Sequence, residues 1–506
     1  MRYSIAILLV ASSLSSAAPA SADTLREALA KAYQSNPTLT GARAAQRALD
    51  ENVPIARASG IPSVDASGGY TENVFNGGNS FVSPARVLTA GPNLVVPLYQ
   101  GGAVRNSVRA AETRVGAGQA SLRGTESNLF TNVVAAYEDV IRDEAIVSLN
   151  QQNVRVLEVN LRASRDRFQV GDLTRTDVAQ SEARLSIARS QLQTAEAQLI
   201  SSRENYIRFV GTPPGTLDEP PPLPNLPASA DQAVATALTD NPFLVAAARQ
   251  RDATRYDINV ARANRLPQVS GVVGGTYRNY LGSLGSGTNI NTGQSGTSGS
   301  LGLQLNLPIF QGGRPAAQVR QAEARRSQAI EQVTETERGV VAQARSAFAV
   351  YRSSQEVIAS SEQAVGANKL SLQGVRAENS VGTRTILDIL NAEQELLNSQ
   401  VTLVSARRDA YVAGFNLLAA MGRAEARDLG LEGGPLYDPT TNYNRVRHRI
   451  GDFGGDGEPM PMATSTTQTP AQDATVTKAL DPLLDTPTVD RNAPLTTGSQ
   501  SPDRKQ

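Results

Sequence analysis

The stretch Pro97-Leu98-Tyr99-Gln100-Gly101-Gly102 returns later in this chain as Pro308-Ile309-Phe310-Gln311-Gly312-Gly313. The copies lie 211 residues apart (97 and 308), and each follows an alternating apolar run and precedes a long helical pattern. Because Pro97 and Pro308 lack a backbone N–H, each is predicted to end ladder pairing on the strand before it. The paired glycines permit a sharp change of direction. The stretch therefore predicts a strand-to-helix exchange point, used once in each half of a duplicated chain.

Proline positions outside the exchange points support the same duplication. Asn36-Pro37 and Asn241-Pro242 each start a helical pattern, and Pro62 and Pro267 stop it, with an offset of 205 in both cases. The repeat divides the chain into a first unit with a hairpin, a Pro-rich linker, a second unit with a hairpin, a C-terminal segment, and a Thr/Pro/Asp/Ser-rich tail that is predicted to be disordered. The first unit spans 23–211 (hairpin about 63–97), the linker 212–230 and the second unit 231–422 (hairpin about 267–308). The C-terminal segment spans 423–455 and the tail 456–506.

Composition narrows the class of protein. The 506 residues carry 48 basic and 48 acidic side chains, which gives no support for a nucleic-acid partner. Arg2, the apolar run 5–11 and Ala20-Ser21-Ala22 predict an export signal over 1–22. The chain has no cysteine, which excludes disulfides and thiolate metal sites. No catalytic, cofactor-binding or metal-binding constellation stands out, so we expect a protein that is not an enzyme, with its single histidine, His448, as a plain surface residue.

Alternating apolar residues predict four strands. Each half has an outgoing strand and a return strand, with these residues on one face: Val64, Ala66, Gly68, Tyr70; Leu88, Ala90, Leu94, Val96; Val269, Gly271, Val273, Gly275, Tyr277; Leu301, Leu303, Leu305, Leu307. The pattern fits membrane barrel strands and equally a soluble, half-buried hairpin. Between the last two strands, the Gly/Ser/Thr/Asn tract 281–300 predicts a surface loop. No later stretch approaches the ~18 consecutive apolar residues of a spanning helix.

Two uninterrupted helical patterns run from Ala103 to about Phe168 and from Pro315 to about Ser380. At ~1.5 Å per residue, each predicts a rod of roughly 95 Å. Apolar residues recur every seven positions in the first rod, at Val147, Val154, Leu161 and Phe168. A surface helix with a 3.6-residue period does not keep this register, so the seven-residue spacing favours a coiled coil. Glycines at 171 and 382 predict the turns from which returning helices run to Gly211 and Gly422.

The stretch from Val381 to Gln394, which reads VGTRTILDILNAEQ, closely resembles the TolC family of outer-membrane efflux and secretion channels. The Asn-Pro starts, the exchange points and Phe168-Gln169-Val170-Gly171 also match, so the resemblance covers about 23–425. It implies a mainly α fold with a membrane β-barrel part, in which a homotrimer forms a twelve-stranded barrel in the outer membrane and a twelve-helix α-barrel across the periplasm. It further implies a passive exit duct that serves an inner-membrane ABC or RND-type transporter and a periplasmic adaptor. Independently, four strands cannot close a barrel, which needs ~8, so several chains must contribute.

Two acidic residues are equivalent under the repeat, Asp177 and Asp388, each six residues beyond a tip glycine. With Thr174 and Thr385 three positions earlier, both fit capping boxes that start the returning helices. In a tube of several chains, one inward carboxylate per repeat would also form a ring that binds multivalent cations. The resemblance implies such a ring position for Asp388, whereas the second ring position is Asn391 here.

The resemblance also implies a gate at this end, the closed periplasmic entrance. Arg384 matches the gate arginine, which links to a Thr-Asp pair on the neighbouring tip, here Thr176 and Asp177. The family's gate tyrosine is Asn379 in this chain, which puts that hydrogen bond in doubt. The alternative is that Arg384 is a solvated charge at a helix end.

We therefore expect an outer-membrane exit channel that extends into the periplasm, opens at its helical tips and serves an efflux pump or a type I secretion system. Two alternatives stay open. A periplasmic coiled-coil adaptor would share the long helices and would be soluble. A stand-alone porin would share the membrane strands, but it would have no need of helices long enough to reach a partner across a gap.

Overall fold

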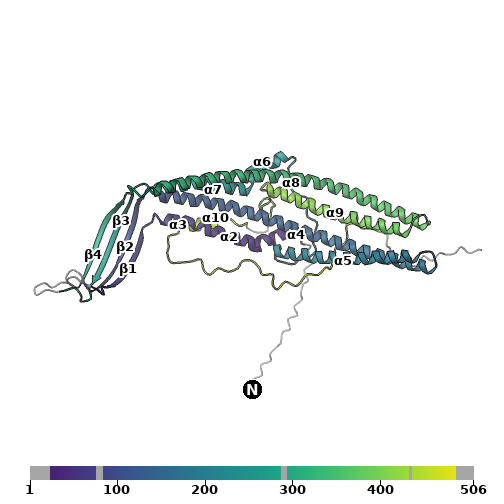
Figure 1. The fold of residues 1–506 in the computed structure, drawn as a ribbon, viewed down its shortest axis with the longest axis horizontal. Helices are drawn as coiled ribbons and strands as arrows, with labels where there is room; N and C mark the ends of the chain where they lie inside the picture. Colours follow the sequence, from purple (N-terminus) through teal and green to yellow (C-terminus); the bar gives the residue numbers. More distant parts are fainter. Residues whose placement is uncertain (1–22, 76–83, 286–292, 432–435, 486–506) are drawn as a thin grey trace, which may run out of the picture.

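The computed structural model describes residues 23–75, 84–285, 293–431 and 436–485. They form a long rod with a small β-sheet at one end and two helical turns at the other (Figure 1). None of the helices in these ranges combines the length and the hydropathy that a membrane crossing requires. The predicted signal peptide, 1–22, lies outside the described residues.

Short helices flank each long one. They are α1 (Leu25–Ser35), α2 (Pro37–Asp50) and α3 (Asn52–Ala58) in the first half, and α6 (Ala230–Asp240) and α7 (Pro242–Ala263) in the second. The Asn-Pro pairs start α2 and α7 as predicted, with Pro in the first helical turn, where its missing N–H costs nothing. Each Asn caps the helix and also donates from Nδ2 to the last turn of a returning helix, Asn36 to Phe209 O (2.8 Å) and Asn241 to Ala420 O (3.0 Å).

The sheet has four antiparallel strands in the order β1-β2-β3-β4, which are β1 (Ser63–Glu72), β2 (Arg86–Gln100), β3 (Gln268–Asn279) and β4 (Ser295–Asn306). Val64 lies opposite Leu94, Leu94 opposite Val273, and Val273 opposite Leu301. This register brings the four predicted apolar sets onto one face of the sheet. Strands β1 and β4 are its two edges.

Two predictions about the strands are wrong. Pro97 does not end pairing, because β2 continues to Gln100 through a register shift between Pro97 and Tyr99; such a bulge accommodates a residue without an N–H. Pro308 does follow the end of β4. The tract 281–300 is also not all loop, since β4 begins at Ser295. Backbone ladder bonds do not depend on apolar side chains, so a Gly/Ser tract can pair.

Each exchange point has two consecutive left-handed glycines. Gly101 and Gly102 have φ of 61° and 80°, and Gly312 and Gly313 have φ of 59° and 82°. A Cβ on Gly101 would lie 2.8 Å from Ala263 O, so this position also requires the absence of a side chain. The glycines lead into α4 (Ala103–Gln169) and α8 (Arg314–Ser380), which have 67 residues each, about 100 Å of helix.

Each long helix pairs with a returning helix, α4 with α5 (Arg175–Val210) and α8 with α9 (Ile386–Ala420). Val147, Val154 and Leu161 are buried, and Val154 and Leu161 pack with Leu185 of α5. These heptad positions thus form the contact between paired helices that the seven-residue spacing predicts. Phe168 is 44% exposed, because the pair of helices ends there.

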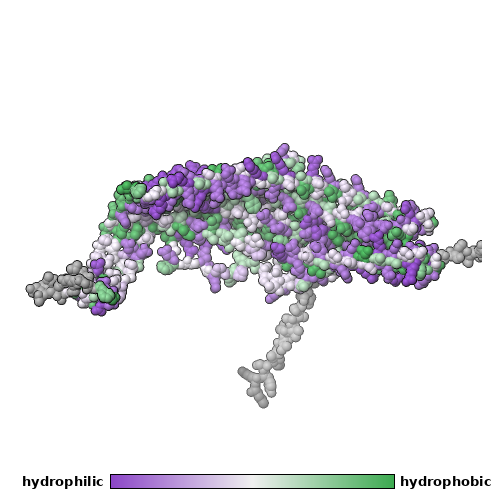
Figure 2. All heavy atoms as spheres, viewed as in Figure 1, coloured by the Kyte–Doolittle hydropathy of each residue, from purple (hydrophilic) through white to green (hydrophobic). Residues whose placement is uncertain are grey.

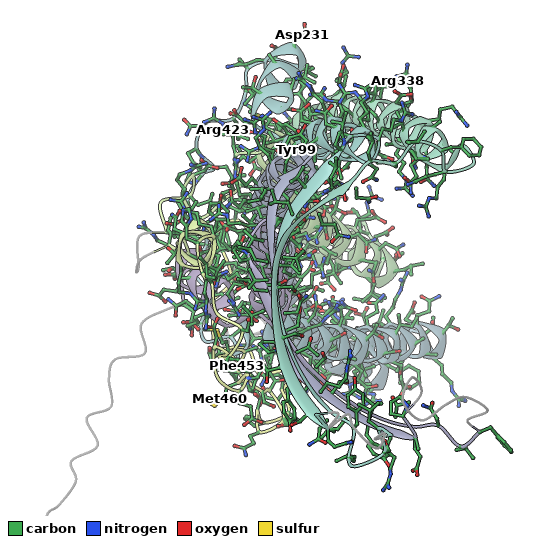
Figure 3. The ribbon with its side chains drawn as sticks, turned by 90° about the vertical axis from the view of Figure 1, so that its left-hand side faces the viewer. Tyr99, Asp231, Arg338, Arg423, Phe453 and Met460 are labelled. Atoms are coloured by element: carbon green, nitrogen blue, oxygen red, sulfur yellow. The ribbon has the colours of Figure 1, made fainter. Side chains whose placement is uncertain are left out.

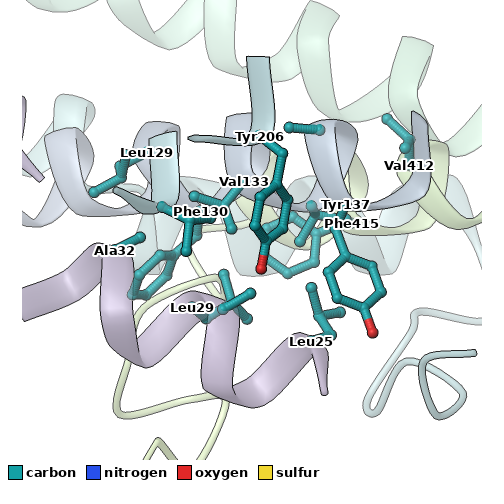
Figure 4. Packing of buried hydrophobic residues seen from close by; sticks show 14 of the residues in the cluster. Leu25, Leu29, Ala32, Leu129, Phe130, Val133, Tyr137, Tyr206, Val412 and Phe415 are labelled. Carbon is teal, nitrogen blue, oxygen red and sulfur yellow. The ribbon is translucent and has the colours of Figure 1, made fainter. Parts of the chain in front are cut away.

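The largest hydrophobic cluster lies in the middle of the rod, where α1 packs on α4 and α5 and where α9 adds further apolar side chains (Figure 4). Tyr137 and Tyr206 are fully buried there. The hydroxyl of Tyr137 donates to Asp23 O (2.9 Å) and Asp218 O (2.7 Å), which ties Asp23 and the linker to α4. The rod therefore has a core at its waist rather than at the sheet.

The prediction of a disordered tail is wrong for residues 464–485. After α10 (Thr440–Val446) the chain runs back along the helices as an extended thread (Figure 1). Lys478 Nζ donates to Leu217 O (2.8 Å), Arg407 of α9 pairs with Asp481 (2.6 Å), and Leu484 is 3% exposed. The tail lacks core-forming composition, but donors on the helices bind its backbone carbonyls. We call residues 464–485 the strap.

Candidate gate at the helical tips

The tips are two glycine turns of the same design. Gly171 and Gly382 both have φ of 83°, a conformation that favours glycine. Asp172 N donates to Arg167 O (2.9 Å), and Thr383 N donates to Glu378 O (3.1 Å). These bonds satisfy carbonyls left over at the ends of α4 and α8, as in a Schellman motif. The turns bring each Thr-Asp pair to the end of the rod.

Both predicted capping boxes are present. Asp177 Oδ2 accepts from Thr174 N (2.9 Å) and Thr174 Oγ1 (2.7 Å), while Asp177 N donates to Thr174 Oγ1 (3.3 Å). Asp388 Oδ2 makes the same bonds with Thr385, at 2.9 and 2.8 Å, with 3.3 Å for the return bond. Each aspartate therefore holds the start of a returning helix.

These bonds keep both carboxylates charged. The hydroxyl and then the backbone N–H of Thr174 lower the pKa of Asp177. The backbone N–H and then the hydroxyl of Thr385 lower the pKa of Asp388. Hydrogen bonds to the ionised form favour that form. Each tip thus carries an ionised aspartate at neutral pH, which an acidic ring requires.

Arg384 pairs within its own tip. Its Nε lies 2.7 Å from Glu378 Oε2, with both side chains about half exposed, and this hydrogen bond raises the pKa of Arg384. Asn379 Nδ2 donates to Arg384 O (2.8 Å), so this asparagine stabilises the turn. It stands at the position where the resemblance implied a gate tyrosine. Among the described residues no ion pair joins Arg384 to Asp177, and Thr176 is exposed. The predicted gate link therefore stays a prediction about tips of neighbouring chains.

The two hairpins of one chain meet just above the tips. Arg184 of α5 donates to Asn391 Oδ1 of α9 (2.8 Å). The position expected to lack ring charge, Asn391, thus serves as a polar link between the hairpins. An aspartate at 391 would also accept this bond, so the residue type alone does not predict the link.

A buried carboxylate missed by sequence reasoning lies two residues beyond Asn391 on α9, about half a turn further from the tip. Glu393 of α9 accepts from Asn160 of α4 (3.0 and 2.9 Å) and pairs with Arg376 of α8 (3.0 Å). Its side chain is 5% exposed, and burial raises its pKa against the hydrogen bonds from Asn160 and Arg376. Because Asn160 and Glu393 lie 233 residues apart, no local pattern indicates this junction of three helices.

His448 is exposed, as predicted, with Nδ1 beside the guanidinium of Arg57. Within the described ranges no group of three or more His, Cys, Asp or Glu could hold a metal ion.

The whole geometry defines a class of protein. A sheet with one apolar face continues into two helical hairpins about 100 Å long, and the chain seen from the sheet end is an open arc (Figure 3). An arc with open edges and charged far tips is one segment of the wall of a long duct.

Comparison with known proteins specifies this class. The family described as outer membrane efflux protein matches residues 28–212 and 233–423, close to the two repeat units, and the chain belongs to this family. It is 33% identical to the outer membrane efflux protein BepC of Brucella suis, over 89% of this chain and 98% of that protein. It is 28% identical to the outer membrane protein TolC of Escherichia coli, over 88% of this chain and 93% of that protein.

A solved structure confirms the fold. The outer membrane protein VceC of Vibrio cholerae matches with a TM-score of 0.66 and 22% identity, over 79% of this chain and 96% of that chain. The family membership and location that the resemblance implied are thus confirmed, and the protein is an outer-membrane efflux channel.

Proposed function

We propose that three copies of this chain form a passive exit duct that opens at its helical tips. The observation that carries the proposal is the chain's polarity: an apolar-faced sheet at one end and paired charged turns about 100 Å away at the other. The sheet would lie in the outer membrane, and the tips would meet the partner that delivers the substrate.

The open edges of one chain support assembly. Strands β1 and β4 have unpaired sides, which lipid does not tolerate. Helix α4 is flanked by α2 and α3 as well as by α7, whereas α8 has α6 and α7 on one side only and buries far fewer residues. By analogy between the repeats, we expect α2 and α3 of a neighbouring chain on the free side of α8. A homotrimer satisfies the sheet and the helices together.

The partners follow from the proposed role. A passive duct needs an inner-membrane transporter of the ABC or RND type and a periplasmic adaptor that joins the two. The name of BepC favours efflux over type I secretion, since that relative is called an efflux protein. A channel of this kind carries out no reaction of its own.

At the gate, we place Arg384 against Thr176 and Asp177 of the neighbouring tip. In the single chain the guanidinium lies half exposed at the end of the rod, so it can reach a neighbour without unfolding a turn. Replacing Asp177 by Ala, or Arg384 by Ser, should loosen the closed state. Single-channel recording in planar bilayers should then show a larger conductance or a longer open time.

Arg189→Ser is a matched control, because Arg189 forms an equally exposed cross-helix pair with Glu158 (2.8 Å) away from the tip. Unchanged conductance in both tip variants would remove the gate assignment. A permanently open wild-type pore would favour the porin, and a detergent-independent soluble protein would favour the adaptor.

A further inference from the structure

The helix ends next to the sheet have a strong charge imbalance, although the whole chain has equal numbers of basic and acidic residues. Twelve arginines and four acids lie in 101–114, 249–268 and 312–326: Arg105, Arg109, Arg114, Arg249, Arg251, Arg255, Arg262, Arg265, Arg314, Arg320, Arg325, Arg326; Glu112, Asp252, Asp257, Glu323. Figure 2 shows hydrophilic residues gathered over these helices, beside a hydrophobic band at the joint with the sheet. These three segments together form a positive belt beside the sheet.

Part of this belt lines a cavity between the start of α4 and the end of α7. Its volume is about 410 Å³, and it is lined by Gly101, Arg105, Asn106, Arg109, Arg255, Tyr256, Asn259, Arg262, Ala263 and Leu266. Four guanidinium groups, two amides and a phenol thus surround one space, with no carboxylate among the lining residues. We call it the arginine pocket.

Three of the four acids in these segments pair with arginines, and the fourth, Glu112, is exposed. Asp257 pairs with Arg114, Asp252 with Arg251 (2.8 Å) and Glu323 with Arg262 (3.2 Å). Across the part of the chain that the structure describes, no ion pair reaches Arg105, Arg109 or Arg255. Like charges held together repel, so an anion that several guanidinium groups contact at once would stabilise the pocket. Phosphate oxygens match the fork of a guanidinium.

The pocket stays accessible in the assembly proposed above. Arg105, Arg109 and Arg123 lie on one side of α4, since 105 and 123 are five helical turns apart. On this side Arg123 pairs with Glu425 (2.7 Å), a residue of the segment after α9. Neighbouring chains would join along the sheet edges and along α8. The side with the arginine pocket therefore remains open.

The position of the arginine pocket along the rod indicates which kind of anion would reach it. Gly101 directly follows β2, and Leu266 precedes β3 by two residues. Leu98 and Tyr99 are 59% and 49% exposed at this joint. If the sheet lies in the outer membrane, as the proposed function requires, the pocket lies at the headgroups of the periplasmic leaflet. Positive clusters at this position attract anionic lipids.

We propose that the arginine pocket binds the phosphate of an anionic phospholipid headgroup. The inference rests on the proposed membrane placement of the sheet. It assigns the arginines a lipid contact that holds the joint at a fixed depth, a role distinct from the gate.

The test is native mass spectrometry of the full-length oligomer titrated with phosphatidylglycerol, phosphatidylcholine or inorganic phosphate. The variant is the triple change Arg105→Gln, Arg109→Gln and Arg255→Gln. The control removes three exposed arginines elsewhere, by Arg155→Gln, Arg162→Gln and Arg338→Gln. We expect phosphatidylglycerol binding to weaken about tenfold in the pocket variant and to stay unchanged in the control.

Unchanged lipid binding in the pocket variant, or equal binding of both lipids by the wild type, would overturn the proposal. Displacement of phosphatidylglycerol by millimolar inorganic phosphate would assign the pocket to free phosphate instead. If the triple variant fails to assemble, Arg255→Gln alone replaces it. Bilayer conductance by the same preparations separates the two proposals, because a protein that conducts but shows no lipid preference fails only this one.

Discussion

At the scale of single residues, Asp388 has two roles that can be separated. It caps α9 through Thr385, and in an assembled tube the same carboxylate would face others at the narrow end. Its lowered pKa means that the capping contribution is present above the usual aspartate value of about 4. The contribution is lost as pH falls through the lowered value of the folded state.

We predict that Asp388→Ala weakens block of the channel by trivalent cations, and that wild-type block persists from pH 7 down to about pH 4 before it falls. The measurement is single-channel current against cation concentration across this pH range. Asp231→Ala, in the first turn of α6 (Figure 3), serves as the control. Identical block in wild type and Asp388→Ala would contradict the ring.

At the scale of elements, Glu393 joins three helices near the tips. Replacing it by Ala removes the carboxylate that Asn160 and Arg376 both contact, and losing hydrogen bonds to a charged group costs roughly 2 kcal/mol. We expect Glu393→Ala to lower the thermal stability of the oligomer, Glu393→Gln to lower it less, and Glu395→Ala, at an exposed neighbouring position, to leave it unchanged. Equal melting of the Glu393→Ala and Glu395→Ala proteins would show that the junction does not stabilise the hairpins.

The strap is a second element that we expect to stabilise the two hairpins. Its residues contact both hairpins, through Arg203 of α5 and through Gln400 and Arg407 of α9. Ending the chain after Ala463 should therefore lower the melting temperature and expose α5 and α9 to protease. Ending it after Asp485 keeps every one of these contacts and is the control. Equal protease patterns for the two truncations would contradict a structural role for the strap.

At the scale of the whole molecule, the two exchange points test how chains assemble. A Cβ on Gly101 meets Ala263 O, whereas one on Gly312 meets nothing within 4 Å in a single chain. If α3 of a neighbour covers α8 as α7 covers α4, Gly312→Ala should destabilise the oligomer as much as Gly101→Ala. Heat resistance of the oligomer on gels measures this.

Gly339→Ala, in open space on α8, should be neutral or slightly stabilising, because alanine favours helix more than glycine does. A Gly312→Ala oligomer that is clearly more heat-resistant than the Gly101→Ala oligomer would contradict this packing, since both glycines have left-handed φ and share the same backbone strain.

Much of the fold follows from local patterns. Asn36-Pro37 and Asn241-Pro242 start helices because proline suits the first turn and asparagine caps it. Side chains on a strand alternate between the two faces of a sheet, so the alternating apolar residues of β1 and β4, such as Val64 and Leu301, could be assigned to one face. The Thr-Asp boxes depend on residues three apart. Such interactions involve neighbours in sequence, and each pattern occurs in both halves of the chain.

By itself the sequence determined the duplicated hairpins, the capped tips, the apolar strand faces and the family. Only the tertiary structure decided the strap along α5 and α9, the bulge at Pro97, the buried Glu393 and the arginine pocket. Each of these depends on which surfaces the long helices and strands bring together. Residues 233 positions apart, such as Asn160 and Glu393, meet only because α9 of the second hairpin packs against α4 of the first.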